Sequence, residues 1–594
     1  MVNRKWRFAL GIFALAFLFL VMPRLARAAT FTVTNNSDTG VSGDGSLRGE
    51  IIAANSAGGT NAIQFASTVT ATIDLISTNG PLIVNGETLT ITGPTTSPGI
   101  TIDGGGQVQL MQVNSGATLN LQFLTLADGS VTGAPGATPG PGDGGAIFNG
   151  GTLTVTNSTL SANTATGGAG GDGGKGEGGA IFNGGTLTVT NSTLSANTAA
   201  GGAGGANGNG EGGAIFNQNG ALLTVINSTF SDNHADGGDV AVGGAIFNDG
   251  MATVTNSTFS TNMTTVSDPD LGVNFGGAIF NDSGTETVTN STFSDNGSLP
   301  GGAAISIFGG TVSLKGTILA GSIRGNCHGT ITDASFNLAD DATCFVNGVN
   351  GNIVESSTSD LGLDPMGLQM NGGPTKTIKL ETSPIMSPAI GLDTDCTDQE
   401  STPQPVLTDQ RHFSRPNSPS KCDSGAYEHD GVAPITGTVH GNLTITHGMT
   451  TIVDATITGN LTQTGGSLVI TSSTVKGNLQ ITGGGTFSID SSTIDGDFQV
   501  QNLPAGSSSD QICGSDVKGN LQVHNNGAPI VIGNASMTCA GNTIGNNLQV
   551  NNNLAALQIF DDMAGGNLQC QSNSPAPAGG GDTAKSLQGQ CASF

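Results

Sequence analysis

A single phrase recurs through the first half of the chain and limits what this chain can fold into. GGAIFN begins at Gly144, Gly178, Gly212, Gly243 and Gly276, and a degenerate GGAAISIF begins at Gly301, at intervals of 34, 34, 31, 33 and 25 residues. Repetition at a period of about 20–50 residues is typical of stacked arrays, in which each unit buries its apolar edge against the next. The sequence therefore predicts a solenoid.

Each repeat predicts three short strands and a loop. In residues 144–177 the strands are AIFN, TLTVT and STLSAN, and a Gly-rich, solvent-facing loop closes the unit. Three strands and three corners make one coil of a parallel β-helix, and coils stack about 4.8 Å apart. Equivalent apolar residues should then form the ladders of an all-β core: Ile147, Ile181, Ile215, Ile246 and Ile279; Val155, Val189, Val225, Val254 and Val288; Leu160, Leu194, Phe230, Phe259 and Phe293.

A polar column is expected at one corner of the coil. Its members are Asn157, Asn191, Asn227, Asn256 and Asn290, which we name the corner asparagines. Asparagine tolerates the left-handed backbone that a tight corner needs. Stacked asparagine side chains can also hydrogen-bond from coil to coil, so we expect this column to form such a ladder.

Residues 1–28 look like a secretory signal peptide. They combine a basic start, the apolar run Phe8–Met22 and a small-x-small site at Ala26–Ala28. No later segment reaches the roughly 18 apolar residues of a membrane span. Without this segment 12 Lys and Arg face 44 Asp and Glu, a net charge of −32. Such a surface repels nucleic acid and anionic lipid, and we expect a secreted or cell-surface protein.

One short helix is expected ahead of the β array. In GSLRGEIIAAN the apolar residues Leu47, Ile51 and Ile52 lie on one helical face, and Ser46 can serve as the N-cap. A lone helix before a long β solenoid predicts a cap over the open end of the first coil.

Eight cysteines lie in the second half of the chain: Cys327, Cys344, Cys396, Cys422, Cys513, Cys539, Cys570 and Cys591. An even number in an exported chain is typical of disulfides. Eight cysteines allow 105 pairings. The simplest hypothesis is sequential pairing: 327–344, 396–422, 513–539 and 570–591.

Several segments resemble known families. GGAI with FxxN resembles polymorphic outer-membrane-protein repeats of the right-handed, pectin-lyase-like β-helix class. The start is similar to CSLREA-type exported proteins, although Gly45 replaces the cysteine. LGLDPMGLQMNGGPTKT, SPIMSPAIGLD, TDQRHFSRP and CDSGAYE, within 359–430, resemble a choice-of-anchor Q domain. The resemblance implies a right-handed parallel β-helix over 29–430 in a surface or secreted protein, mostly without an assigned reaction.

A different repeat fills residues 431–594. GNL recurs at Gly441, Gly459 and Gly477, with later forms at Gly496, Gly519 and Gly566, between alternating strands such as LTITH and FSIDSSTI. The shorter spacing, which begins at 18 residues, predicts a second, narrower β-solenoid. Its handedness stays open.

Two clusters are candidate binding sites. Asp143, Glu177 and Glu211 each precede a GGAIFN phrase, so stacking would place their carboxylates about 4.8 Å apart. Like charges that close fan into water or share a cation; the two hypotheses are solvated side chains and a weak Ca²⁺ site. The second cluster is the phenylalanine column: Phe148, Phe182, Phe216, Phe247 and Phe280. If Ile faces inward, these rings face outward, either as a partner-binding stripe or covered by the Gly-rich loops.

Glu286 departs from the pattern. By alignment on Asn290 it takes the core position of Leu153, Leu187 and Leu223. Because a lone buried carboxylate is costly, we expect a local bulge that turns Glu286 outward, not a catalytic acid.

These features favour a non-enzymatic rod that contacts an extracellular polysaccharide or protein surface, and no catalytic residue is assigned. The alternatives are a polysaccharide lyase or hydrolase acting in an external groove, and a purely architectural spacer. Such enzymes need paired carboxylates, or carboxylate-bound calcium with an Arg or Lys base. After loss of Trp6 the only Tyr or Trp is Tyr427, whereas sugar grooves commonly use such rings.

Overall fold

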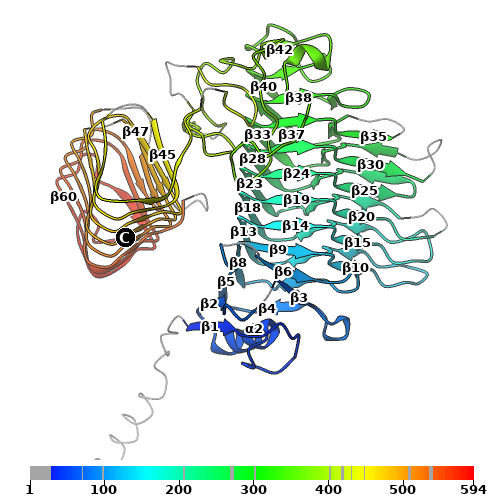
Figure 1. Cartoon of the computed structure of the whole chain (residues 1–594), viewed down its shortest axis with the longest axis horizontal. Coiled ribbons are helices and arrows are strands. Elements are labelled where there is room, and N and C mark those ends of the chain that lie inside the picture. The colour runs from blue at the N-terminus through cyan, green and yellow to red at the C-terminus, as the bar shows by residue number, and fades with distance from the viewer. Residues whose placement is uncertain are drawn as a thin grey trace, which may run out of the picture.

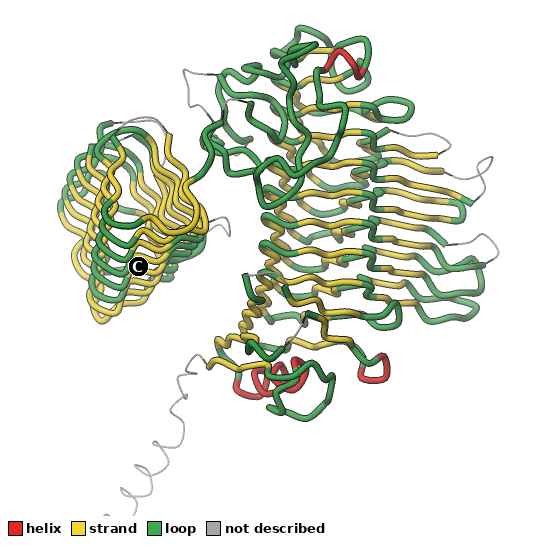
Figure 2. Tube along the Cα trace, viewed as in Figure 1, coloured by secondary structure: helices red, strands yellow, loops and turns green. Residues whose placement is uncertain are grey.

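The computed structural model describes residues 29–69, 71–95, 99–204, 208–267, 273–299, 303–399, 403–415, 421–429, 431–446, 449–483, 485–505, 510–533 and 539–594. The predicted signal peptide lies outside these ranges. Two stacks of parallel strands make up the fold, and a connecting segment, residues 362–434, lies between them in the chain (Figures 1 and 2). The described parts of this segment contain little regular structure.

Three sheets enclose the core of the first stack, a right-handed parallel β-helix. Sheet 1 contains β1 (Ala29–Val33), β2 (Thr60–Phe65), β5 (Thr88–Thr92), β8 (Thr118–Gln122), β13 (Thr152–Thr156), β18 (Thr186–Thr190), β23 (Leu222–Ile226), β28 (Met251–Thr255), β33 (Thr285–Thr289), β37 (Thr311–Lys315) and β40 (Asp333–Ser335). Sheet 2 contains β3 (Thr72–Asp74), β6 (Ile100–Asp103), β9 (Leu124–Ala127), β14 (Thr159–Ser161), β19 (Thr193–Ser195), β24 (Thr229–Ser231), β29 (Thr258–Ser260), β34 (Thr292–Ser294), β38 (Ile318–Ala320), β41 (Leu338–Ala339) and β42 (Ile353–Val354). Sheet 3 contains β4 (Leu82–Val84), β7 (Met111–Val113), β12 (Ile147–Asn149), β17 (Ile181–Asn183), β22 (Ile215–Asn217), β27 (Ile246–Asn248), β32 (Ile279–Asn281), β36 (Ile305–Ile307) and β39 (Cys327–His328).

The Gly-rich loops form two further sheets, which the sequence did not predict. Sheet 4 contains β10 (Ser130–Thr132), β15 (Thr164–Thr166), β20 (Thr198–Ala200), β25 (His234–Gly237), β30 (Met263–Val266) and β35 (Gly297–Leu299). Sheet 5 contains β11 (Gly142–Asp143), β16 (Gly176–Glu177), β21 (Gly210–Glu211), β26 (Val240–Val242) and β31 (Val273–Phe275). The loops therefore stack as an extension of the coils, on the right of Figure 1.

The predicted core ladders are confirmed. Ile147 pairs with Ile181, Val155 with Val189 and Leu160 with Leu194, and the same registers continue through the later coils. All members of the three ladders are fully buried. Stacking like on like lets each coil bury its apolar edge against two neighbours, which is the source of solenoid stability.

The GGAIFN phrase needs its glycines for two different reasons. The first glycine of each phrase has a left-handed backbone, with φ between +65° and +69°. The second has no such torsion, but a Cβ at Gly145, Gly179, Gly213 or Gly244 would lie 2.0–2.3 Å from the carbonyl oxygen of the next coil. Successive coils therefore approach so closely that the second position of the phrase has room only for glycine.

The capping helix is confirmed as α2 (Leu47–Ala57), and Ser46 accepts a hydrogen bond from the Gly49 amide. Helix α2 lies at the blue end of the stack in Figure 1 and packs on β1, β2 and β4. Arg48 is buried against Asp38, with 2.6 Å between Nε and Oδ1, and also donates to the Gly80 and Pro81 carbonyls. A short 3-10 helix, η1 (Ser77–Asn79), lies beside this network.

The corner asparagines are left-handed as predicted, with φ of 46–51°. The predicted coil-to-coil hydrogen bonds belong to two other columns. Asn149, Asn183, Asn217, Asn248 and Asn281 form one amide ladder with steps of 2.8 Å. Asn163, Asn197, Asn233, Asn262 and Asn296 form the other. Among the corner asparagines, the side-chain oxygens of Asn191, Asn227 and Asn290 have no hydrogen-bond partner.

The prediction for Glu286 is wrong. Strand β33 pairs without a bulge with β28 and β37, opposite Ala252 and Val312. Glu286 is 1% exposed, and neither carboxylate oxygen has a hydrogen-bond partner. Burial raises its pKa to about 8. The continuous ladder on both sides of β33 therefore holds a carboxyl group inside the core.

The connecting segment follows η2 (Thr358–Leu361) and is held by isolated antiparallel bridges, such as Asp393 with Cys422. All four predicted disulfides are present: Cys327–Cys344, Cys396–Cys422, Cys513–Cys539 and Cys570–Cys591. The second of them closes a loop within the connecting segment. Disulfides are compatible with an extracellular protein. Within the described ranges, none of the helices has the length and apolar character to cross a membrane.

The second solenoid is also confirmed. It contains β43 (Ile435–Val439), β44 (Leu443–Ile445), β45 (Met449–Ile457), β46 (Leu461–Gln463), β47 (Ser467–Thr471), β48 (Thr474–Val475), β49 (Leu479–Thr482), β50 (Phe487–Asp490), β51 (Thr493–Ile494), β52 (Phe498–Gln501), β53 (Asp510–Cys513), β54 (Asp516–Val517), β55 (Leu521–His524), β56 (Ile530–Ile532), β57 (Thr543–Ile544), β58 (Leu548–Asn551), β59 (Leu557–Phe560), β60 (Met563–Gln571), β61 (Ala578–Gly580) and β62 (Thr583–Gly589). From β46 to β57 each strand pairs with the third one along the chain, so a coil there has three strands. Its apolar core is separate from that of the first stack.

Candidate functional site

The carboxylates predicted to stack do stack, in sheet 5. Asp143 pairs with Glu177, and Glu177 pairs with Glu211. The next two coils place Val242 and Phe275 at the same position. The carboxylate ladder, Asp143–Glu177–Glu211, is therefore limited to three coils.

A lysine and protonation relieve the repulsion within this ladder. Lys175 Nζ lies 2.9 Å from the Glu211 carboxylate and 3.9 Å from that of Glu177. Burial, together with the charges of Glu211 and Asp143, raises the pKa of Glu177 to about 7. Burial also raises the pKa of Asp143. Protonation of Glu177 near neutral pH therefore relieves part of the repulsion, and the Lys175 ammonium lies at the Glu211 end of the ladder.

Calcium at Asp143, Glu177 and Glu211 stays a prediction. Over the described residues, no group of three or more His, Cys, Asp or Glu side chains is arranged to hold a metal ion. The carboxylates are close enough to interact, and the Lys175 ammonium takes a position that a shared cation would otherwise fill. Oxygen-rich coordination of the kind calcium prefers would require this ammonium to move.

We expect Glu177→Gln to remove a pH dependence from sheet 5. The folded-state pKa, about 7, lies above the ordinary 4.5, so the stabilising contribution is complete below pH 4.5 and is lost as the pH rises through 7. The loss amounts to about 2–3 kcal/mol by pH 8. Hydrogen exchange of the β16 amides, corrected for intrinsic base catalysis, should accelerate between pH 5 and 8 in the native protein and not in the variant. Asp172→Asn, on the exposed part of the same loop, is the control. An unchanged pH profile in E177Q would contradict the assignment.

The phenylalanine column is not an exposed stripe. Phe182, Phe216, Phe247 and Phe280 are only 6–7% exposed. Rings of successive coils lie 4.7–5.6 Å apart, and Val242 of sheet 5 packs against them. Phe148, at the start of the column, is partly buried and stacks on Phe182 at 5.1 Å. Of the two hypotheses, an exposed binding stripe is contradicted for these four rings, and cover by the loops agrees with their burial.

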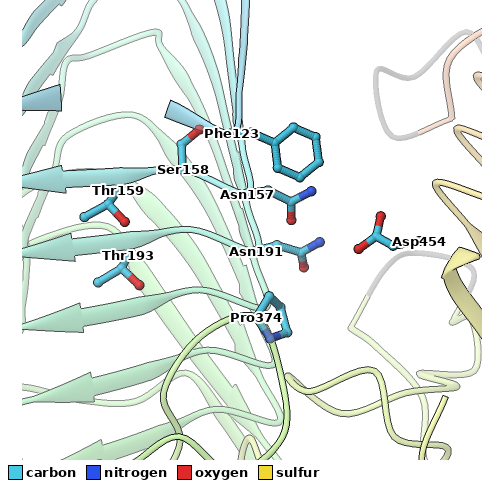
Figure 3. A pocket seen from close by; sticks show the side chains of 8 residues that line it. All are labelled: Phe123, Asn157, Ser158, Thr159, Asn191, Thr193, Pro374 and Asp454. Carbon is cyan, nitrogen blue, oxygen red and sulfur yellow. The ribbon is translucent and has the colours of Figure 1, made fainter. Parts of the chain in front are cut away.

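A groove at the corner asparagines is the site that sequence reasoning missed. A pocket of about 190 Å³ is lined by Phe123, Asn157, Ser158, Thr159, Asn191, Thr193, Pro374 and Asp454. Figure 3 shows the Asn157 and Asn191 amides pointing into it, with Pro374 of the connecting segment at one end and Asp454 of the second solenoid opposite. A second, more open pocket continues along the same corner past Pro94, Thr95 and Gly99.

The chemistry of this corner groove is polar and neutral on the side of the β-helix. It offers amides from the corner asparagines and hydroxyl groups from Thr159 and Thr193, whereas the Ser158 hydroxyl is bonded within the stack, to the Thr156 carbonyl and the Leu124 amide. Asn191 is only 8% exposed, and its Oδ1 has no hydrogen-bond partner. Asp454 adds a carboxylate from the other side. The only signal in the sequence is the asparagine column itself, which predicts a corner but whose side chains are expected to bond from coil to coil.

Comparison with known proteins adds little to this site. No protein-family profile matches the chain, and no curated protein matches it. Among solved structures, the chain is similar to a PL6 family alginate lyase, AlyGC, at 9% identity and a TM-score of 0.21, covering 89% of this chain and 97% of that one. A point mutant of that enzyme matches at 9% identity and a TM-score of 0.20, covering 95% of each chain. Likeness at this level carries no inference about function.

Proposed function

We propose that the chain is an exported, non-catalytic rod that contacts an extracellular polysaccharide or protein surface. The observation that carries the proposal is the unbroken parallel register from β2 to β37, in which every coil repeats the same outward-facing positions. Such a stack is stiff and presents a long repetitive surface. Residues 1–28 would direct export, and four disulfides suit an oxidising compartment.

In the same proposal the chain has three functional parts: a signal peptide (1–28), a β-helix that ends in a Q-type segment (29–430, with the Q-type part at 359–430), and a second solenoid (431–594). The Q-type assignment is supported by its motifs, because TDQRHFSRP and CDSGAYE supply Arg415, Asp423 and Glu428, which contact one another. The second solenoid would then hold the rod at its site of attachment.

One observation favours the alternative, a polysaccharide lyase or hydrolase. Glu177, with a pKa of about 7, lies beside Asp143 and Lys175 on the outside of the β-helix. A carboxyl group poised near neutral pH suits general acid–base catalysis. Its side chain is only 13% exposed, which limits access for a polymer and makes this the second candidate.

A screen of residues 29–594 against acidic and neutral polysaccharides and matrix proteins tests the proposal, with binding and product release scored in parallel. We expect saturable binding to at least one immobilised surface without new reducing ends or unsaturated uronate. If the native protein releases product and E177Q does not, the proposal of a non-catalytic rod is wrong and the enzyme is the better assignment. Absence of binding to every surface would favour the purely architectural spacer.

A further inference from the structure

The connecting segment occupies the corner groove in the later coils of the β-helix. Asn256 Nδ2 donates to the Thr408 carbonyl at 2.7 Å, and Arg415 Nη2 donates to Asn256 Oδ1 at 3.3 Å. Thr229 Oγ1 donates to the Lys376 carbonyl at 2.7 Å. These contacts join residues about 150 positions apart in the chain. The molecule therefore contains an example of what this corner binds.

The open groove repeats the same binding groups. Thr159 and Thr193 are in register with Thr229, Thr258 and Thr292, all of which bond to the connecting segment. Asn157 and Asn191 have the same left-handed backbone as Asn256. The connecting segment covers the corner only as far as Pro374, which lines the pocket. The two coils that lie beyond Pro374 thus present an amide and a hydroxyl group in the same arrangement with which the covered coils bind the connecting segment.

The open coils lack the partners that the covered coil has. Asn256 has both a carbonyl acceptor and a guanidinium donor. Asn191 Nδ2 faces Asp454 across the pocket (Figure 3). Asn191 Oδ1 is buried without a hydrogen-bond partner, as is Asn227 Oδ1 under the connecting segment. An amide N–H that faces the pocket can donate to a backbone carbonyl of a ligand, as Asn256 Nδ2 does to the Thr408 carbonyl.

The charge of the groove selects the kind of ligand side chain. Asp454 faces the amides across the pocket, and the whole chain carries a net charge of −27. A cationic group would be attracted to this groove over a long range. A guanidinium can donate at once to a carboxylate and to an amide oxygen because its five N–H groups are held in a fixed plane.

We propose that the corner groove beyond Pro374 binds a peptide segment of a partner protein that carries an arginine, with its guanidinium on the Asp454 carboxylate and its backbone carbonyls on the Asn157, Asn191 and Thr193 side chains. This inference rests on the proposed function as a partner-binding rod and names the partner class and the site. The segment from 375 to 415 supplies the chemical precedent in the covered coils.

The test uses a fluorescent synthetic peptide copied from Gln404–Arg415, which contains the groups that bind Asn256, and full-length protein from residue 29. We expect saturable binding by fluorescence anisotropy, at least tenfold weaker when the arginine of the probe that corresponds to Arg415 is replaced by alanine. In the protein, Asn157→Gly with Asn191→Gly keeps the left-handed backbone and removes both amides, and should weaken binding at least tenfold. Asn525→Gly with Asn552→Gly is the matched control, because both residues are left-handed and exposed in the second solenoid. Melting curves confirm that each variant is folded.

Three results would overturn the inference. One is equal peptide binding by the corner variant and the native protein. Another is that the peptide does not bind, whereas a polysaccharide binds the native protein and does not bind the corner variant. The ligand of the groove would then be a sugar, and the proposed function would stand. The third is absence of binding to the peptide and to every surface in the screen, which removes both proposals.

Discussion

Replacing Glu286 by leucine is expected to stabilise the β-helix by about 4 kcal/mol at pH 8. The carboxyl group is fully buried between Ala252 and Val312, without a hydrogen bond. Equivalent positions in earlier coils hold Leu153, Leu187 and Leu223, which are buried in the same ladder. Leucine is close to glutamate in size, so the change removes a desolvated acid without opening a cavity.

The pH dependence gives the sharper test. Burial raises the pKa of Glu286 from 4.5 to about 8, so the folded state binds its proton more tightly than the unfolded chain does. The contribution to stability is therefore complete below pH 4.5 and is lost as the pH rises through 8, by about 5 kcal/mol in total. The gain in melting temperature of E286L over the native protein should be small at pH 4.5 and grow steadily to pH 8.

Glutamine at the same position separates the cost of the buried charge from the cost of an unpaired polar group. Glu286→Gln removes the titration but leaves an unpaired buried amide, so its melting temperature should lose this part of the pH dependence and stay below that of E286L at every pH. Because a solenoid can unfold in parts, melting should be followed together with hydrogen exchange of β28, β33 and β37. A lower melting temperature for E286L than for the native protein at pH 8 would show that the carboxyl group has a stabilising partner.

The repeat made much of the fold predictable, because a fixed period determines which residues share a ladder. Ile147 over Ile181 and the Ser46 cap follow from local pattern alone. Sequential pairing predicts the four disulfides correctly because each one joins two cysteines that follow one another along the chain. The sequence predicts only solvent-facing loops between the repeats, because the Gly-rich stretches lack apolar alternation, although glycine permits the close backbone approach by which these loops stack.

The errors share one cause: the direction of a side chain depends on its surroundings as well as on its position in the repeat. The energetic cost of a buried acid suggested a bulge at Glu286, but a bulge would break ladder hydrogen bonds on both sides of β33. Asn149 and Asn163 point into the stack, whereas Asn157 faces the groove. The connecting segment has no period, so its return along the corner could not be predicted from the sequence.

That return depends on Arg415, and Arg415→Ala is expected to release the connecting segment from the β-helix. Arg415 is fully buried, and its guanidinium contacts Glu428 Oε2 at 2.8 Å, the Asp423 carbonyl at 2.8 Å and the Gly425 carbonyl at 2.6 Å. Its Nε also donates to the Thr408 carbonyl, and its contact to Asn256 joins the segment to the corner. Removing one partner of a buried ion pair typically costs about 3–5 kcal/mol, because the other charge stays behind unpaired.

The expected result is local and should be distinguished from global unfolding. In R415A, hydrogen exchange should accelerate around Gln410, Ala426 and Thr258, while the β12, β17 and β22 amides stay protected. The double variant Arg415→Met with Glu428→Leu removes both charges and should recover most of the protection, since apolar pairs of similar volume often replace buried ion pairs without loss. Lys421→Ala, on the exposed part of the same segment, is the control. If R415A leaves exchange in the segment unchanged, the Cys396–Cys422 disulfide and the Gln410 contacts suffice to hold it. In that case the corner groove binds its covering segment through amides and hydroxyl groups alone, and the guanidinium is dispensable there.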